Sequence, residues 1–519
     1  MPITHGNSTS VPTNVLRQHA SFIDQYPAVL VRRLDPARLS CNPDRLPSYL
    51  RHPMARAYQR YIFETFGSLI TTPSIEEIVK TDAGWKLRKD RRREIAARIE
   101  LIIERHGLGV GMLVLHAQQM FTKHIPLELE TDSGTIDLAT ETIAAYGDND
   151  ERIVYVPVRA FRSDADALAR YGIVKPKAFW DPSKIVSHEG DKNPCFYCSV
   201  GEMNPNEVIV RVPKESLGVG RNYCFGFTFA PFGNPLRMCH FLAWDDAHDP
   251  LNMNRFPFTF SDLVKLTVGI NESIARFFSG TGITDYPVID GVSNGWAGNS
   301  IFHQHFQFFE REFALPIEPI EHLDPEPLVL HDGIVIHEVR WPTPIFQIAT
   351  DSVENLCNTG NEVSLLWRHV GGDLTELFKT FPDGYTPKAG DFIPRHTQNL
   401  YVPGAFQGHL AFYIPRDKRH VNYEETLIAH DGAFLDEKQR IRAFPKMNIG
   451  IMEETGQVIV DDKSVFDRAI AWEPRVVGRQ VRNIITATRP NDDHMETFKA
   501  SVRKTLFSTN LRRQGSQEP

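Results

Sequence analysis

The stretch GNSIFHQHFQFFERE, residues 298–312, alternates polar and aromatic side chains as a β-strand does. Successive side chains of a strand point to opposite faces, so His303, His305 and Gln307 share one face. The opposite face carries Phe302, Gln304, Phe306 and Phe308. The phenylalanine face requires a hydrophobic core behind it. The other face presents two imidazoles and an amide together.

Two imidazoles and an amide on one buried face indicate either phosphate chemistry or a satisfied structural pair. Their desolvation is unfavourable unless a metal, a phosphate or hydrogen bonds compensate for it. A neutral imidazole can attack phosphorus and form a phosphoramidate. A neighbouring amide can orient the ring or donate to a phosphate oxygen. The motif alone leaves these functional and structural interpretations balanced.

Short apolar runs separated by Gly, Pro and Asn predict further strands on both sides of this stretch. The runs that precede it are RIVYVPV, EVIVRVP, NYCFGFTFAPF and RMCHFLAWDD. Among them, residues 260–280 predict one helix with an apolar stripe formed by Leu263, Leu266, Ile270, Ile274 and Phe277. This order predicts an α+β fold, with antiparallel sheets and helices packed on one face.

The C-terminal half repeats this texture coarsely. GIVIHEVRW, NEVSLLWRHV, TQNLYVPG and GHLAFYIPRDKRHV predict strands, and a helix broken at Pro474 follows from about Ser464. His-x-His-x-Gln does not recur there, which predicts a single active centre. The basic residues after Pro415 suit a charged edge strand better than a phosphate site. Nearer the N-terminus, residues 74–105 predict a helix, and HGLGVGML (106–113) predicts a turn rather than a dinucleotide loop.

Composition excludes several classes of function. The 519 residues carry 57 Lys and Arg against 65 Asp and Glu, a net charge of −8, which disfavours nucleic acid or an anionic membrane as partner. A nucleic-acid interaction through RKDRRR (88–93) is the weaker alternative, because a solvated helix face accounts for those residues. The sequence predicts no membrane span and no signal peptide, and six cysteines form no disulfide framework, so we expect a cytoplasmic protein.

A Cys-x-x-Cys pair, Cys195 and Cys198, lies in NPCFYCSVGE. Two thiolates at this spacing indicate half of a zinc site or a redox pair, and no thioredoxin-like context surrounds them. A closed zinc site needs two more ligands. The candidates are Cys239, His240, His248 and His303. Two free thiols in a surface turn are the structural alternative.

Four segments in order, CFYC, FLAWDDAH, SNGWAGNS and HQHFQ, resemble the galactose-1-phosphate uridylyltransferase and GDP-hexose phosphorylase branch of the histidine triad superfamily. They cover about residues 190–312. The resemblance implies a nucleotidyltransferase or phosphorylase of carbohydrate metabolism, acting on a nucleotide-sugar or dinucleotide through a covalent nucleotidyl-histidine. It also implies a phosphate or sugar phosphate as second substrate, and a homodimer, since members are often dimeric.

The resemblance assigns roles to individual residues. His305 is the expected nucleophile, and Gln307 is expected to hydrogen-bond oxygens on phosphorus. Asn294, Gly298 and Ser300 belong to the expected substrate loop. Structural zinc is expected to be held by Cys195, Cys198, His248 and His303, with His240 as the less favoured alternative to His248.

Two positions depart from the transferase pattern, because Phe302 and Gln304 stand where transferases usually have proline. The phosphorylase branch has bulkier residues there and does not always keep the zinc. A non-catalytic, zinc-stabilised nucleotide-binding protein of the same fold is the alternative to an enzyme. We expect an N-terminal, partly helical extension over 1–150, a catalytic histidine-triad-like lobe over 151–330 and a second related lobe without the motif over 331–519.

Overall fold

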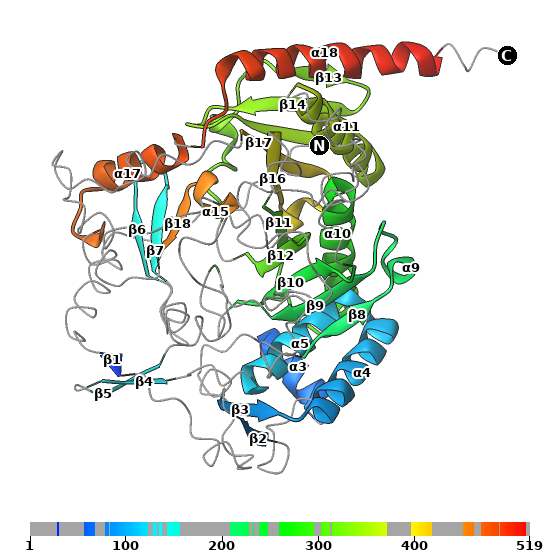
Figure 1. Ribbon diagram of the computed structural model, residues 1–519, viewed down its shortest axis with the longest axis vertical. Helices are drawn as coiled ribbons and strands as arrows, with labels where there is room; N and C mark the ends of the chain where they lie inside the picture. Colours follow the sequence, from blue (N-terminus) through cyan, green and yellow to red (C-terminus); the bar gives the residue numbers. More distant parts are fainter. Residues whose placement is uncertain are drawn as a thin grey trace, which may run out of the picture.

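The structure is a computed structural model (Figure 1), and it describes the chain in segments. These are residues 29–30, 57–67, 78–81, 84–122, 128–131, 134–137, 143–155, 208–227, 232, 238–247, 259–294, 303–311, 314–370, 396–417, 450–460, 469–486 and 488–514.

A ten-stranded antiparallel sheet organises the chain, and its first half is built around the helix α10 (Thr259–Phe278). The strands of this half are β8 (Val210–Val212), β9 (Tyr223–Phe227), β10 (His240–Asp245), β11 (Ile289–Ser293) and β12 (His305–Glu310). Their order across the sheet is β8-β9-β10-β12-β11. β12, which carries the histidine motif, therefore lies between β10 and β11, inside the sheet.

The second half of the sheet has the same arrangement around the helix α11 (Val353–Val370). Its strands are β13 (Val329–His331), β14 (Ile334–Val339), β15 (Ile345–Thr350), β16 (His396–Val402) and β17 (Leu410–Asp417). The order β13-β14-β15-β17-β16 matches that of the first half, and β11 pairs with β16 to join the halves. Figure 1 shows the strands running from β8 at the lower right to β13 near the top.

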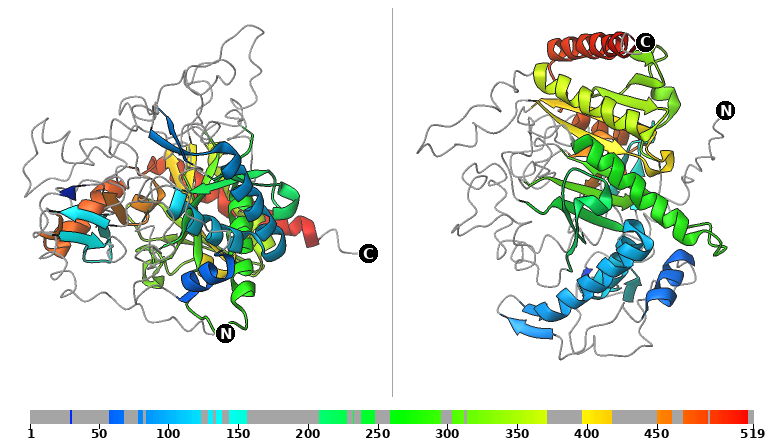
Figure 2. Two further views of the ribbon diagram at one scale, coloured as in Figure 1. Left: turned by 90° about the horizontal axis from the view of Figure 1, so that it is seen from below. Right: turned by 90° about the vertical axis from the view of Figure 1, so that its right-hand side faces the viewer.

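Helices cover one face of this sheet. α10 and α11 pack side by side, as the right-hand view of Figure 2 shows, and α5 (Leu108–Thr122) packs on α10. α3 (Ala57–Phe66), α4 (Lys89–His106) and the C-terminal α18 (Asp492–Gln514) extend this layer. The predicted stripe of α10 is confirmed, with Leu263, Leu266, Ile270 and Ile274 buried and Phe277 partly buried. None of the helices that the structure describes is long and apolar enough to cross a bilayer.

Smaller elements cover the opposite face. β6 (Ile143–Tyr146), β7 (Arg152–Tyr155) and β18 (Gln457–Val460) form a three-stranded sheet, with the short helix α15 (Ile451–Glu454) next to it and α17 (Pro474–Thr486) packed on it. Side chains of this unit share a core with Val292, Tyr401 and Phe412 of the large sheet. Further elements are β1 (Val29–Leu30), β4 (Glu128–Thr131), β5 (Gly134–Asp137), the short helix α9 (Lys214–Leu217), η6 (Ile320–His322) and η8 (Gly404–Phe406).

The α+β fold with a large antiparallel sheet is confirmed, and three local predictions are wrong. Residues 78–81 and 84–87 do not extend the helix, because β2 (Ile78–Thr81) and β3 (Gly84–Leu87) are strands there that pair antiparallel. The run NEVSLLWRHV lies in the helix α11 instead of a strand. HGLGVGML starts the helix α5, because Gly109 and Gly111 let it pack closely: a Cβ on Gly109 would meet the Ile270 carbonyl oxygen.

Candidate active site

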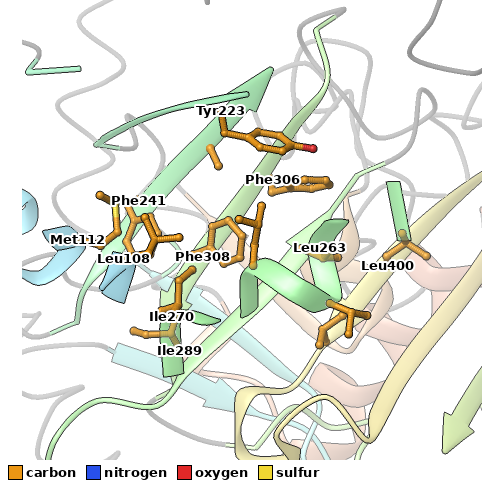
Figure 3. Packing of buried hydrophobic residues seen from close by; sticks show 14 of the residues in the cluster. Leu108, Met112, Tyr223, Phe241, Leu263, Ile270, Ile289, Phe306, Phe308 and Leu400 are labelled. Carbon is orange, nitrogen blue, oxygen red and sulfur yellow. The ribbon is translucent and has the colours of Figure 1, made fainter. Parts of the chain in front are cut away.

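The two faces of β12 separate as the alternation predicts. Phe306 and Phe308 lie in the core beneath the helices, and Figure 3 shows them close to Leu263 and Ile270 of α10. Gln307 pairs across the sheet with Leu242 on one side and Val292 on the other, and Val292 belongs to the core of the opposite face. His305, two residues from Gln307, therefore lies on the face away from the helices.

His305 is held by a hydrogen bond to its own chain. Its Nδ1 lies 2.7 Å from the carbonyl oxygen of His303. A carbonyl oxygen can only accept, so Nδ1 carries the proton and, in the neutral ring, Nε2 carries the lone pair. The imidazole is 6% exposed as a whole. This arrangement fixes the tautomer in which Nε2 could act as a nucleophile.

His303 is fixed in a similar way at the end of β10. Its Nε2 lies 2.7 Å from the carbonyl oxygen of Asp245, so Nε2 carries the proton and Nδ1 is the ring atom that could ligate a metal. Asp245 precedes the predicted ligand His248 by three residues. Cys195, Cys198 and His248 lie outside the described residues, and the described ones contain no cluster of three potential ligands. Of the four predicted ligands, the structure describes His303 alone, and the zinc site stays a prediction.

His240, the alternative ligand, has a different environment. Its Nδ1 accepts a hydrogen bond from the backbone of Phe232 at 3.1 Å, and its ring packs on Phe232 at 4.6 Å. It pairs in register with Phe309, four residues along β12 from His305. His240 is therefore part of the core and is separated from the histidine motif.

Gln307 presents a buried acceptor. Its Oε1 has no hydrogen-bond partner among the residues that the structure describes. An unpaired buried polar atom costs about 1–3 kcal/mol, so it is a group that a ligand donor can satisfy. A rotation of the carboxamide would place its NH2 group there instead. Either orientation leaves this side chain available to a ligand on the face of His305.

Asn294 is the member of the predicted substrate loop that the structure describes, while Gly298 and Ser300 lie outside the described residues. It directly follows β11, and its Oδ1 accepts a hydrogen bond of 2.7 Å from the backbone nitrogen of Ile451 in α15. Extension of the β11–β12 register by two residues from the Val292–Gln307 pair brings Asn294 opposite His305.

Sequence reasoning missed four residues on this face. Trp244 is the direct cross-strand neighbour of His305, and Asn399 donates to Glu454 Oε2 at 2.6 Å. Arg416 Nε lies 3.1 Å from Glu454 Oε1, and both side chains are buried. Burial raises the pKa of Glu454, against the opposing effect of Arg416. Only the alternation in HFLAWD could have indicated Trp244, because the partners of Glu454 come from distant strands.

The placement of Arg416 corrects the prediction of a charged edge strand. β17 lies between β15 and β16, and Arg416 is paired and buried instead of solvated. The other basic residues of that cluster, Lys418, Arg419 and His420, lie outside the described residues. Register pairs connect Gln307, Val292, Tyr401 and Phe412 in one row, so Phe412 lies on the face that carries His305. On that face β17 carries Leu410, Phe412 and Ile414 before Arg416. The described part of the second half thus offers no histidine in place of His305 on β17.

Comparison with curated proteins gives distant relatives that share one activity name. A galactose-1-phosphate uridylyltransferase of Streptococcus pneumoniae (strain Hungary19A-6) is 21% identical over 239 residues, 46% of this chain and 41% of that protein. The protein of the same name from Ligilactobacillus salivarius (strain UCC118) is 26% identical over 144 residues, 28% of this chain and 26% of that protein. The match thus spans less than half the length of these relatives. No protein-family model and no solved structure matches the chain.

Proposed function

We propose that this chain is a nucleotidyltransferase that forms a covalent nucleotidyl-histidine at His305. The observation that carries the proposal is the 2.7 Å contact of His305 Nδ1 with the His303 carbonyl oxygen, because it leaves the lone pair on Nε2. The distant similarity to uridylyltransferases supports the same class of reaction. A histidine pair with a purely structural role would need neither this tautomer of His305 nor the neighbouring Gln307 Oε1 that has no hydrogen-bond partner among the described residues.

The reaction consists of two displacements at one phosphorus. Nε2 of His305 attacks the α-phosphorus of the donor, the N–P bond forms, and the anhydride P–O bond breaks with its electron pair on the leaving phosphate group. Positive charge develops on the ring, and the carbonyl oxygen of His303 stabilises the Nδ1–H that carries part of it. The acceptor oxygen then attacks the same phosphorus and returns the electron pair to Nε2. Gln307 and the NH2 group of Asn294 are the proposed donors to the phosphate oxygens.

The proposed zinc is structural and is held by Cys195, Cys198, His248 and His303. A closed zinc site supplies folding free energy and rigidity instead of a Lewis acid. His303 would contribute Nδ1, since its Nε2 donates to Asp245. The contact of the His303 ring with Asp245 helps to fix the carbonyl group of His303. That carbonyl group in turn orients the ring of His305 for the reaction.

The names of the relatives suggest a nucleotide-sugar as donor and a hexose 1-phosphate as acceptor. Inorganic phosphate is the acceptor in the phosphorylase form of the same proposal. The first half of the sheet, which carries His305, corresponds in this proposal to the catalytic histidine-triad-like lobe, and the second half corresponds to the related lobe without the motif. Homodimer formation and a role in carbohydrate metabolism belong to the same proposal.

Trapping of the intermediate tests the proposed function. The chain is incubated with UDP-glucose, UDP-galactose or GDP-glucose labelled with ³²P at the α-phosphate, and acid and base lability of the bound label are measured. We expect a base-stable, acid-labile label that is absent in His305→Ala and present in the control His331→Asn, on the edge strand β13. Binding without any label, and with equal affinity in both variants, would instead favour the non-catalytic nucleotide-binding protein.

A further inference from the structure

Asp245, the last residue of β10, has a partner for each of its hydrogen-bonding groups. Its backbone nitrogen donates to the carbonyl oxygen of Gln304 at 3.0 Å, and its own carbonyl oxygen accepts from His303 Nε2 at 2.7 Å. Its carboxylate accepts from the backbone of Ala247 at 3.0 Å and from an Arg221 terminal nitrogen at 2.8 Å. Asp245 is thereby fixed through both its backbone and its side chain.

The Arg221–Asp245 ion pair is largely shielded from water. The side chains of Arg221 and Asp245 are 10% and 11% exposed. In the adjacent pair, Arg211 Nε lies 3.4 Å from Asp246 Oδ1, and the Arg211 side chain is 73% exposed. A desolvated pair with good geometry restrains its members strongly, while an exposed pair contributes little. The two neighbouring pairs therefore form a natural comparison, because only the first is both buried and connected to the histidine motif.

Three short contacts connect Arg221 with the nucleophile. Arg221 holds the carboxylate of Asp245, the carbonyl oxygen of Asp245 holds the ring of His303, and the carbonyl oxygen of His303 holds Nδ1 of His305. Asp245 also anchors Gln304, which lies between the two histidines. The peptide segment that presents the acceptor for His305 is thus attached to Asp245 from both sides.

We propose that Arg221 and Asp245 are positioning residues, which set the ring orientation and tautomer of His305 through His303. This inference rests on the proposed function and extends it to two residues that do not touch the reacting atoms. When the ring of His305 becomes cationic, its Nδ1–H needs a carbonyl oxygen at a fixed place. Loss of the Arg221 contact leaves the carboxylate of Asp245 with only the Ala247 hydrogen bond among the described residues, loosens the end of β10 and displaces that oxygen.

Kinetics of the full-length chain separate positioning from substrate binding. We expect Arg221→Met and Asp245→Asn to lower kcat of the nucleotidyl transfer about 10- to 100-fold, with KM changed less than about twofold. Arg221→Lys keeps the charge and should recover part of kcat. The matched control Arg211→Met removes the exposed neighbouring pair and should leave both constants at the wild-type values.

Histidine-selective ¹⁵N NMR of the same chains provides a readout that does not depend on activity, with His305→Asn used for assignment. We expect a single Nδ1–H tautomer of His305 in the wild type and in Arg211→Met, and a mixture of tautomers in Arg221→Met and Asp245→Asn. If the wild type transfers no nucleotide, the proposed function fails. The tautomer of His305 in the variants still tests whether Arg221 and Asp245 position its ring. If Arg221→Met does not fold, Asp245→Asn decides it. A folded Asp245→Asn or Arg221→Met chain with the wild-type tautomer and the wild-type kcat would overturn it.

Discussion

The side-chain oxygen of Asn294 and the backbone nitrogen of Ile451 lie 2.7 Å apart, although 157 residues separate them in the chain. The backbone N–H can only donate, so the atom that faces it is Oδ1, and the NH2 group of Asn294 points elsewhere. Asn294 lies at the His305 end of β11. A segment from the far C-terminal part of the chain thus determines which end of this amide a phosphate would meet.

Asn294→Asp tests this orientation. Aspartate can still accept from Ile451, but its second oxygen replaces two donors with negative charge beside the proposed phosphate position. We expect the dissociation constant for a nucleotide-sugar to rise at least about tenfold, which corresponds to about 1.4 kcal/mol, while the thermal midpoint changes little. Titration calorimetry and thermal unfolding measure the two quantities. Unchanged affinity would remove Asn294 from the binding site.

A buried network with one excess carboxylate predicts pH-dependent stability. Arg311 contacts Asp290 at 3.1 Å and Glu318 at 2.8 Å, and the hydroxyl of Tyr401 lies 2.7 Å from each carboxylate. Burial raises the pKa of Asp290, Arg311 opposes this, and Glu318 reinforces it. The folded protein therefore retains a proton on Asp290 at pH values where the unfolded chain has lost it.

A proton retained in the folded state makes stability fall as pH rises. The fall begins near the ordinary Asp pKa of 3.8 and ends at the raised pKa of the folded protein. Its slope approaches about 1.4 kcal/mol per pH unit for one proton. We expect Asp290→Asn to flatten this part of the curve, as measured by urea unfolding between pH 4.5 and 7.5. An equal slope in both proteins would show that Asp290 is not the group responsible.

The local periodicity of the sequence was sufficient to predict the centre of the fold. The two-residue period in HFQFF places Phe306 and Phe308 against α10, and the helical period predicts α10 itself. Both patterns arise from contacts with one core on one side, so they are readable within a short window. The identity of the face that carries His305 follows from the same alternation.

Periodicity was insufficient where tertiary contacts determine the structure of a segment, or where the apolar run is too short to distinguish a helix from a strand. The run NEVSLLWRHV is too short to show that Leu356, Val363 and Trp367 form one helical stripe, and all three are buried in α11. The closely spaced glycines of α5 resemble a turn, and the partner that requires Gly109, α10, lies about 160 residues away. The contacts of Asn294 and Glu454 join separate strands and a distant helix, and no local pattern encodes them.

Gly109 and Gly269 form a matched pair for testing the packing of α5 on α10. A Cβ on Gly109 would collide with the Ile270 carbonyl oxygen, whereas a Cβ on Gly269 has open space. We expect Gly109→Ala to destabilise the fold by about 1–3 kcal/mol through overpacking. Gly269→Ala, inside α10, should stabilise it by about 0.5–1 kcal/mol through helix propensity. Chemical denaturation measures both, and equal effects of the two substitutions would contradict the close approach of the helices.

The proposed zinc site predicts that metal loss and stability loss occur together in some variants and separately in others. We expect one zinc per chain by mass spectrometry, and none in His303→Asn or Cys195→Ser, each with a lower thermal midpoint. Structural zinc binds with about 10 kcal/mol or more in small zinc peptides, so its removal by a chelator should lower the midpoint of the wild type as well. Cys239→Ser is the control, because Cys239 lies buried in the core beneath the helices. It should lower stability while the zinc content stays at one per chain. If Cys239→Ser lost the zinc and Cys195→Ser kept it, Cys195 would not be a zinc ligand and the predicted site would be wrong.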